Sequence, residues 1–442
     1  MVMNAVLIAV IIMVGLSLAR VHVVLSLIVG AVVGGLLAGL PLTDTLTAFQ
    51  DGIKNGAQIA LSYAVLGAFA MAIAHSGAPK MFANSITARL GNMNASTSTK
   101  WLLFAAIFAM AIASQNVVPI HIAFIPLIVP PLLLVFNHLK VDRRAIACII
   151  TFGLVNTYMF IPYGFGDIFL NQIILKNVSE NGVDVSGVSI VSVMAIPALG
   201  MLLGLLVAVL FSYRKPRIYQ DVALNHSQNT DKPAPKVSSY RALIALVAII
   251  GAFVMHRYTD SLLIGSLTGF AIFMASGVVK WSEADNVFND GIKMMAMIGF
   301  IMITAQGFAE VMKATGEIAP LVDGAMQLFS GNKAIAALVM LIIGLVVTLG
   351  IGSSFSTVPI IASIYVPLCM AMGFSVPATI ALVATAGVLG DAGSPASDST
   401  LGPTMGLGMD SQHDHIKDTV IPTFLHFNLP LIVFGWIAAM VL

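Results

Sequence analysis

The chain has 442 residues, of which 58% are hydrophobic and 9% are charged, and its formal net charge is +1 at pH 7. A soluble domain carries about 25% charged residues, and a soluble chain of this length could not bury so much apolar surface, so lipid must face most of it. The near-neutral charge and the lack of a basic tract or zinc-type Cys/His spacing give no support to nucleic acid binding. We therefore expect a multi-pass protein of the cytoplasmic (inner) membrane, with the lipid bilayer as its first partner.

Apolar runs predict the membrane spans in chain order. They fall at residues 4–18, 23–40, 57–74, 145–163 and 188–213 in the first half, and at 243–255, 262–279, 294–312, 377–389 and 420–442 in the second. The first run lacks the basic start and the cleavage site of a signal peptide, so we expect a retained span. Two longer stretches, 101–136 and 334–372, are interrupted by polar residues, and each is either two full spans or one re-entrant hairpin.

A repeat relates the two halves of the chain. Residues 49–54 read Phe-Gln-Asp-Gly-Ile-Lys and residues 288–293, which lie 239 positions later, read Phe-Asn-Asp-Gly-Ile-Lys. A duplicated hydrophobic unit with breaks at corresponding positions is typical of secondary transporters. We predict an all-α polytopic membrane protein with two inverted repeats of about five transmembrane helices, each with a re-entrant helical hairpin and a broken helix. The expected domains are a first repeat (1–213), a cytoplasmic linker (214–240) and a second repeat (241–442).

The distribution of positive charge supports this topology. If both interrupted stretches are hairpins, each half crosses the membrane five times and the second half is inverted. With the linker in the cytoplasm, 16 of the 21 Lys and Arg residues lie inside and five lie outside, as the positive-inside rule requires. Both termini and the loop 167–186 would then lie outside. The Gly30-x-x-x-Gly34 pattern favours close helix packing, within the subunit or in a homodimer.

Four polar clusters interrupt the hydrophobic stretches and match in pairs, two at the turns of the hairpins and two near the ends of the spans that follow. Non-helical backbone at membrane depth is tolerated only where protein or a water-filled cavity satisfies it, and neutral oxygen ligands suit a hard cation such as sodium. A simple kink explains any single break, but four matched breaks favour a site. The candidate substrate or cation ligands are Ser114, Gln115, Asn116, Asn156, Thr157, Ser353, Ser354, Ser356, Thr357, Asp391, Ser394, Asp398, Ser399 and Thr400.

Acidic residues sharpen the prediction. A carboxylate at the bilayer centre costs about 2.5–3.5 kcal/mol, and no Lys or Arg lies in the four clusters to neutralise one. We therefore expect Asp391 and Asp398 to bind a sodium ion or a proton, with no cofactor beyond that coupling ion. Asp167 and Glu310 are either further proton or substrate groups or interfacial acids that face water. His121 is either such a group or a packed, neutral imidazole.

The eleven residues at 390–400, Gly-Asp-Ala-Gly-Ser-Pro-Ala-Ser-Asp-Ser-Thr, resemble the Gly-Asp…Ser-Pro-x-Ser-Asp-Thr-Thr motif of the sodium/proton antiporter C-like family within the wider ion transporter superfamily. Ser399 stands where that family usually has Thr, which keeps the hydroxyl group. The residues that the resemblance places at the cation or substrate site are Asp391, Ser394, Asp398, Ser399 and Thr400.

The resemblance implies a cation-coupled secondary active transporter, sodium/proton antiporter-like, that works by alternating access. Relatives in this family carry organic substrates, so the alternative is a sodium- or proton-coupled amino-acid permease of the cationic amino acid or histidine type. The cargo would thus be a small cation or an amino acid. The chain has no His-Glu-x-x-His motif of a membrane metalloprotease, and we predict that it is not an enzyme.

Overall fold

The computed structural model describes residues 4–19, 21–78, 81, 97–117, 121–221, 239–259, 261–329, 331–351, 353–395 and 397–442, and within these ranges the chain forms helices and no strand. The first half comprises α1 (Ala5–Leu18), α2 (Val23–Leu37), α3 (Leu42–Ser76), α5 (Thr97–Ile112), the π-helical η1 (Ala113–Val117), α6 (His121–His138), α7 (Arg143–Tyr158), α8 (Phe165–Asp167), η2 (Ile168–Leu175), α9 (Lys176–Glu180), α10 (Ile190–Val207) and η3 (Ala208–Ser212). The second half comprises α11 (Ser239–Thr259), α12 (Leu262–Ala275), α13 (Trp281–Ala314), α14 (Ile318–Phe329), α15 (Lys333–Ile351), α16 (Ser354–Ala371), α17 (Val376–Val388), α18 (Asp398–Leu407), η4 (His415–Val420), α19 (Ile421–Thr423), η5 (Phe424–Asn428) and α20 (Leu429–Val441).

The helices of the two halves follow one order at nearly constant offsets. α2 and α12 begin at residues 23 and 262, and α3 and α13 at 42 and 281, so both pairs are 239 positions apart. α7 and α17 begin at 143 and 376, and α8 and α18 at 165 and 398, so these pairs are 233 positions apart. The repeat of the sequence is therefore a repeat of the structure.

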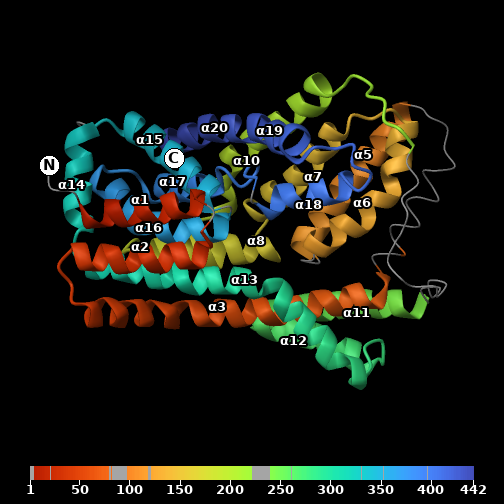
Figure 1. Cartoon of the computed structure of the whole chain (residues 1–442), viewed down its shortest axis with the longest axis horizontal. Coiled ribbons are helices and arrows are strands. Elements are labelled where there is room, and N and C mark those ends of the chain that lie inside the picture. Colours follow the sequence, from red (N-terminus) through yellow and green to blue (C-terminus); the bar gives the residue numbers. More distant parts are fainter. Residues whose placement is uncertain are drawn as a thin grey trace.

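The two longest helices, α3 and α13, lie side by side along the lower part of the molecule in Figure 1. A Cβ atom built on Gly52 would lie 2.7 Å from the Cα of Gly307, and one built on Gly291 would lie 2.3 Å from the Cα of Ala68. Gly291 lies 239 positions after Gly52, and Ala68 lies 239 positions before Gly307. The second contact is therefore the equivalent of the first with the roles of α3 and α13 exchanged, and the two helices are antiparallel. Such reciprocal contacts require an approximate two-fold axis perpendicular to both helices, which inverts one half relative to the other.

These two long helices extend well beyond the predicted spans. α3 has 35 residues and α13 has 34, whereas the hydropathy pattern predicted spans only at 57–74 and 294–312. Charged residues end the apolar runs, but they lie on exposed helix faces and form i,i+3 pairs, Asp51 with Lys54 and Asp290 with Lys293. The helices therefore continue through them. The 12-residue helix α14 was also not predicted.

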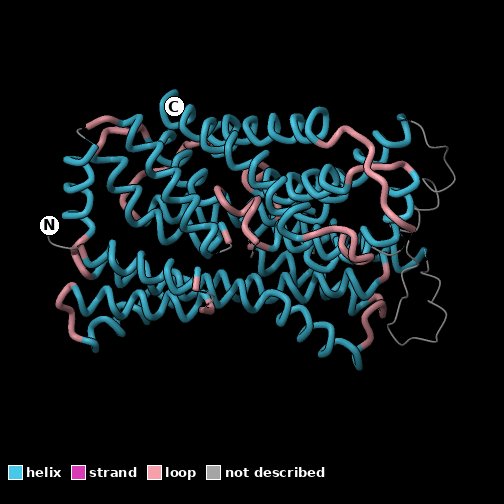
Figure 2. Tube along the Cα trace, turned by 45° about the horizontal axis from the view of Figure 1, so that its top comes forward, coloured by secondary structure: helices cyan, strands magenta, loops and turns pink. Residues whose placement is uncertain are grey.

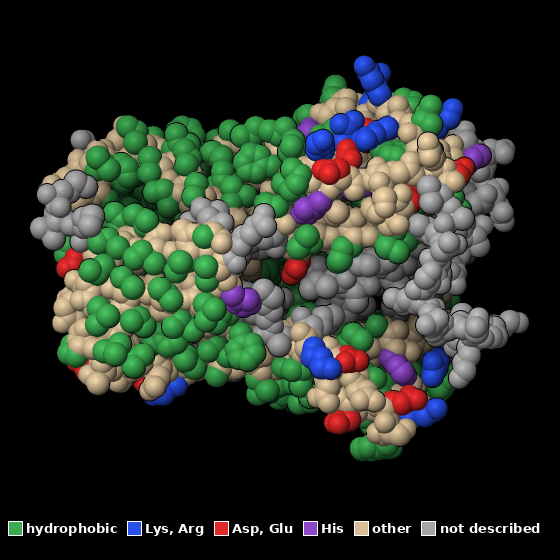
Figure 3. Space-filling view, in the orientation of Figure 1, with side chains coloured by type: hydrophobic (Ala, Val, Ile, Leu, Met, Phe, Trp, Pro, Cys, Tyr) green, Lys and Arg blue, Asp and Glu red, His purple; other side chains and the backbone are tan. Residues whose placement is uncertain are grey.

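The surface is that of a membrane protein. Within the described residues, five helical stretches are long and apolar enough to cross a bilayer: Ser98–Asn116, Ile190–Ser212, Ser239–Thr259, Ser354–Ala371 and His415–Val441. Large apolar side chains such as Leu199, Leu203, Leu246 and Ile250 are exposed along α10 and α11. Figure 3 shows apolar side chains over much of one face, with charged side chains gathered toward its right end. The predicted all-helical, multi-pass architecture is confirmed.

Loops lie in the middle of the molecule as well as at its ends (Figure 2). The two predicted helix breaks are the segments between α7 and α8 and between α17 and α18. In the first predicted hairpin, the expected turn residues 114–116 instead continue α5 as the π-helical segment η1. Because Ser98–Asn116 is by itself long and apolar enough to cross a bilayer, the re-entrant course of this stretch stays a prediction. In the second hairpin, α16 begins at Ser354, two residues after Gly352, which lies outside the described residues.

Both chain ends lie on the left in Figure 1, and local contacts hold each of them. Asn4 Nδ2 donates to the carbonyl of Glu317 at 2.7 Å, and Ser375 Oγ donates to the carbonyl of Leu442 at 2.9 Å. Residues 222–238, most of the predicted linker, lie outside the described residues. The side of the membrane that each end faces, and the domain boundaries at 213 and 241, stay predictions.

Candidate cation and substrate site

The carboxylate of Asp391 is buried at the helix break that follows α17. Its Oδ2 accepts hydrogen bonds from Tyr158 Oη at 2.5 Å and from Ser399 Oγ at 3.4 Å, and its Oδ1 accepts one from Ser397 Oγ at 2.5 Å. The residue is 5% exposed. Every hydrogen-bond partner that the described part of the chain gives this carboxylate is a hydroxyl group, and no Lys or Arg there forms an ion pair with it.

Local sequence explains why the helix breaks here. Gly390 and Gly393 have φ values of +94° and +128°, a backbone region that residues with a Cβ rarely adopt. Asn428 satisfies the opened backbone, since it accepts from the N–H of Gly390 and donates to the carbonyl of Ala392, both at 2.7 Å. Ser397 then caps α18 by accepting from the N–H of Ser399 at 3.1 Å. The same Ser397 hydroxyl donates to Asp391, so the start of α18 and the carboxylate are tied together.

Both halves of the chain contribute to this site. Tyr158 is the last residue of α7 in the first half, and its Oη also lies 2.9 Å from the Oγ of Ser354 at the start of α16 in the second. The Tyr158 ring packs against Phe169 and Phe355, with centroids 4.8 and 5.3 Å apart. The first helix break, the tip of the second hairpin and the second break therefore meet at Asp391. Sequence reasoning did not select Tyr158 as a site residue, although it follows Asn156 and Thr157 in the second polar cluster.

The η1 segment meets the first helix break. Asn116 Nδ2 donates to the carbonyls of Ile161 at 3.1 Å and Thr157 at 3.4 Å. Gly164 (φ +61°) packs so closely that a Cβ there would lie 2.2 Å from the carbonyl oxygen of Asn116. Three buried amide oxygens in this region have no hydrogen-bond partner among the described residues: those of Gln115, Asn116 and Asn156. Each of them has lone pairs that a ligand can use.

Several other predicted ligands bond to nearby backbone. Ser114 donates to the carbonyl of Ala111, Thr157 to that of Gly153, Thr357 to that of Ser353, Ser394 to that of Leu349, and Thr400 to those of Ser394 and Ser397. Ser356 is buried in α16, and Ser353 immediately precedes that helix. These residues shape the hairpins and breaks, and none of them contacts Asp391 by a hydrogen bond in the described structure.

The predicted acids occupy different environments. Asp398, expected to act with Asp391, is the exposed first residue of α18 and makes no hydrogen bond or ion pair within the described ranges. Glu310 has a side chain 38% exposed and lies 3.9 Å from Lys313. Asp167 lines a cavity beside α11. His121 begins α6, but the role predicted for its side chain lies outside the described residues.

Sequence reasoning missed Asn428 and Arg143. Asn428 was a polar residue inside the predicted span 420–442, which could have signalled its role. Arg143, the first residue of α7, is fully buried and pairs with Asp410 after α18. Among the described residues no group of three His, Cys, Asp or Glu side chains has the arrangement of a metal site.

Two halves with inverted helices, a break in each and a shared buried carboxylate define a multi-pass membrane transporter rather than an enzyme. The chain belongs to the Na+/H+ antiporter family: it matches that family over residues 149–436, and a second match, also described as a Na+-H+ antiporter family, covers residues 4–90.

Relatives match along the whole of both chains. An uncharacterized membrane protein of Vibrio parahaemolyticus is 54% identical and one of Haemophilus influenzae is 47% identical. The Bacillus subtilis protein YuiF, which carries a provisional name as an amino acid transporter, is 46% identical.

Solved structures share the fold at low sequence identity. The YdaH transporter of Alcanivorax borkumensis is 16% identical with a TM-score of 0.59, over 90% of this chain and 87% of that one. MtrF of Neisseria gonorrhoeae, described as illuminating a class of antimetabolite efflux pumps, is 17% identical with a TM-score of 0.59, over 91% and 85%.

Proposed function

We propose that this protein is a cation-coupled secondary active transporter of the sodium/proton antiporter type in the cytoplasmic membrane, and that Asp391 binds and releases the coupling ion. The observation that carries the proposal is a buried carboxylate surrounded by hydroxyl groups, without a Lys or Arg partner in the described structure. An uncompensated carboxylate inside a membrane protein is costly and marks an ion or proton pathway. Sodium and a proton are the ions that fit, because oxygen ligands suit hard cations.

The ligands around Asp391 come from both inverted halves. Tyr158 belongs to the first half, and Ser354, Ser397 and Ser399 belong to the second. Movement of one half against the other therefore changes the set of oxygen atoms around the carboxylate. In inverted-repeat transporters such movement exposes the site to the two sides in turn. This supports coupling of ion release to alternating access.

The second candidate is a sodium- or proton-coupled amino-acid permease. The name of YuiF, 46% identical along the whole chain, favours it. A cavity lined by side chains of both charges also favours it, because an amino acid carries both charges at neutral pH. In this function Asp391 keeps its role as the ion-binding group, and the cargo is an amino acid of the cationic or histidine type.

Flux in proteoliposomes tests the proposal. An inward sodium gradient should drive protons out of vesicles that contain a pH-sensitive dye and the purified protein. Asp391→Asn should abolish this flux while the protein still elutes as a single folded species, because the neutral amide cannot exchange a cation. The matched control is Glu310→Gln, which changes a half-exposed acid beside Lys313 and should keep the flux.

Two results would change the proposal. Full sodium-driven proton flux in Asp391→Asn would remove Asp391 from the mechanism. Uptake of a labelled amino acid driven by a sodium or proton gradient, without sodium/proton exchange in its absence, would replace the antiporter with the second candidate.

A further inference from the structure

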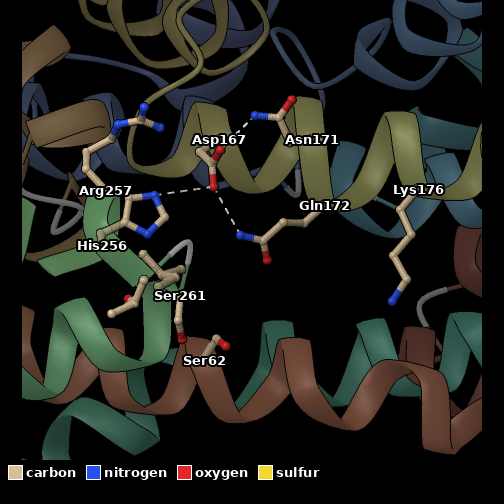
Figure 4. A pocket seen from close by; sticks show the side chains of 10 residues that line it. Ser62, Asp167, Asn171, Gln172, Lys176, His256, Arg257 and Ser261 are labelled. Carbon is tan, nitrogen blue, oxygen red and sulfur yellow. Dashed lines mark hydrogen bonds and ion pairs between the residues drawn. The ribbon is translucent and has the colours of Figure 1, made fainter. Parts of the chain in front are cut away.

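A cavity of about 680 Å³ lies between the α8–η2–α9 segment of the first half and α3, with α11 at one side (Figure 4). Ligand pockets for small molecules are typically about 300–1,000 Å³. Asp167, Asn171, Gln172 and Lys176 line it from the α8–η2–α9 segment, and His256 and Arg257 line it from α11. None of the residues hydrogen-bonded to Asp391 lines this cavity, so it is a place separate from the ion site.

The carboxylate of Asp167 is held in a fixed orientation. Its Oδ1 accepts from Asn171 Nδ2 at 2.7 Å, and its Oδ2 accepts from Gln172 Nε2 at 3.1 Å and lies 3.6 Å from His256 Nε2. Figure 4 shows these side chains converging on the carboxylate at the edge of the cavity. Within the described residues no Lys or Arg forms an ion pair with it. The remaining lone pairs of the carboxylate can accept hydrogen bonds from a cationic group in the cavity.

The same cavity carries the guanidinium group of Arg257. Arg257 makes no hydrogen bond and no ion pair with any residue that the structure describes, although it lines the cavity with Asp167. His256 Nδ1 is buried and also has no hydrogen-bond partner in the described part of the chain. A free guanidinium binds carboxylates through two parallel hydrogen bonds. Lys176 also lines the cavity, but its Nζ lies 3.9 Å from Glu180. The cavity therefore presents the carboxylate of Asp167 and the guanidinium of Arg257, and the described structure has no ion pair between these two groups.

We propose that this cavity, which we call the Asp167 cavity, binds a small zwitterion, an α-amino acid, with its ammonium group on Asp167 and its carboxylate on Arg257. The inference rests on the second candidate function and deepens it by giving the cargo a site. An inorganic cation or an anion would satisfy only one of the two groups, whereas a zwitterion satisfies both.

A small cavity adjoins this one, shares His256 and Leu262 with it, and is also lined by Asn116 and Gly164. It therefore reaches the η1 segment and the first helix break, where the Asn116 side-chain oxygen has no partner among the described residues. A solute held at Asp167 is thus next to the segment that the inverted-repeat mechanism would rearrange.

The second half has a polar cavity at the equivalent place. A cavity of about 590 Å³ is lined by Thr404, Met405 and Met409, which lie 233 positions after Asn171, Gln172 and Lys176. Its lining contains acids and histidines but no Lys or Arg. The two halves therefore place cavities at matching points. Of these two, the Asp167 cavity is the one lined by both an acid and an arginine, as recognition of a zwitterion requires.

Binding to the purified full-length protein in detergent tests this assignment. Equilibrium dialysis with radiolabelled amino acids should show saturable binding of at least one of them. Its decarboxylated amine and its N-acetyl derivative should each bind about tenfold more weakly or worse, because each loses one charged contact. Asp167→Asn and Arg257→Gln should weaken binding of the intact amino acid by a similar factor.

The matched control variants each remove a charge of the same sign at a residue outside the cavity. Asp184→Asn and Arg214→Gln alter exposed residues and should leave binding unchanged. If Arg257→Gln does not elute as a folded species, Arg257→Lys keeps the charge and loses the two-pronged geometry, and should still weaken binding of the carboxylate.

The outcomes separate this inference from the proposed function. Sodium-driven proton flux without binding of any amino acid would refute the assignment of the Asp167 cavity as an amino-acid site and would leave the proposed role of Asp391 intact. Binding that is unchanged in both Asp167→Asn and Arg257→Gln would also overturn it. Binding that survives in Asp391→Asn while coupled flux is lost would support both.

Discussion

Arg143 at the start of α7 and Asp410 in the loop after α18 form a bidentate ion pair, with Nη1–Oδ1 and Nη2–Oδ2 distances of 2.6 Å. The two side chains are 0% and 3% exposed. Arg143 Nη1 also donates to the carbonyl of Leu407 at 2.9 Å. Burial by itself would raise the pKa of Asp410, but the hydrogen bonds and charge of Arg143 hold that pKa below its ordinary value. The pair therefore fastens the first half to the second.

Breaking this pair should destabilise the protein strongly. Removing one partner of a buried ion pair leaves an uncompensated charge and costs about 3–5 kcal/mol. We expect Arg143→Gln and Asp410→Asn each to lower the Tm in detergent well below that of the wild type. Lys54→Gln is the matched control, since Lys54 and Asp51 are 75% and 54% exposed in their pair and exposed pairs contribute about 0–1 kcal/mol. Equal Tm values for the three variants would contradict a stabilising role of the Arg143–Asp410 pair.

Ser397 should matter for both stability and transport. Its hydroxyl caps α18 and donates to Asp391, and loss of an N-cap costs about 0.5–2 kcal/mol. Ser397→Ala should lower the Tm and reduce sodium-driven flux. Ser397→Thr keeps the hydroxyl and should restore both. A Tm for Ser397→Ala equal to that of the wild type would show that the cap contributes nothing.

The glycines between α3 and α13 should tolerate no side chain. A Cβ on Gly291 would lie 2.3 Å from backbone atoms of Ala68, and one on Gly52 would lie 2.4 Å from the carbonyl oxygen of Gln306. Overpacking costs about 1–3 kcal/mol, so alanine at either position should lower the Tm, and by similar amounts because the halves are related by symmetry. Gly15→Ala, which meets nothing within 4 Å, should be neutral or stabilising. Similar Tm values for Gly291→Ala and Gly15→Ala would argue against the close crossing.

Cysteine labelling tests the predicted topology. The native Cys148 and Cys369 are buried, so the wild type should react little with a membrane-impermeant maleimide. Asp184→Cys in the predicted outer loop should be labelled in intact cells, and Arg214→Cys should be labelled only after permeabilisation. The reason is the excess of Lys and Arg on the predicted inner side. The reverse pattern, or a reporter that places the C-terminus inside, would refute this orientation.

His413 should make stability fall in mild acid. Burial lowers its pKa from 6.5 to about 4 in the folded protein. Between these values the unfolded chain binds a proton that the folded chain does not, so stability is full above pH 6.5 and falls as the pH drops toward 4. The loss is on the order of 3 kcal/mol. His413→Gln should flatten the dependence of Tm on pH in this window, and an unchanged slope would exclude His413 as its source.

The sequence by itself determined the class of protein and the places where helices break. Composition shows that most of the surface must face lipid. The duplicated Phe-x-Asp-Gly-Ile-Lys segment reveals the repeat, and the glycines at 390 and 393 mark a helix break, because hydropathy and backbone conformation depend on neighbouring residues in the sequence. The same local reasoning found only the apolar parts of α3 and α13, because an exposed pair such as Asp51 and Lys54 interrupts hydropathy without interrupting a helix.

Only the tertiary structure decided which polar residues act together. Tyr158 and Asp391 are 233 positions apart, and Asn428 is 38 positions from the Gly390 backbone that it satisfies. Asp391 and Asp398 belong to one motif and look alike in sequence, yet one is enclosed by hydroxyl groups from both halves and the other is exposed. The physical reason is that a carboxylate's affinity for a cation depends on its surrounding dielectric and partners, and those are set by distant segments that only folding brings to it.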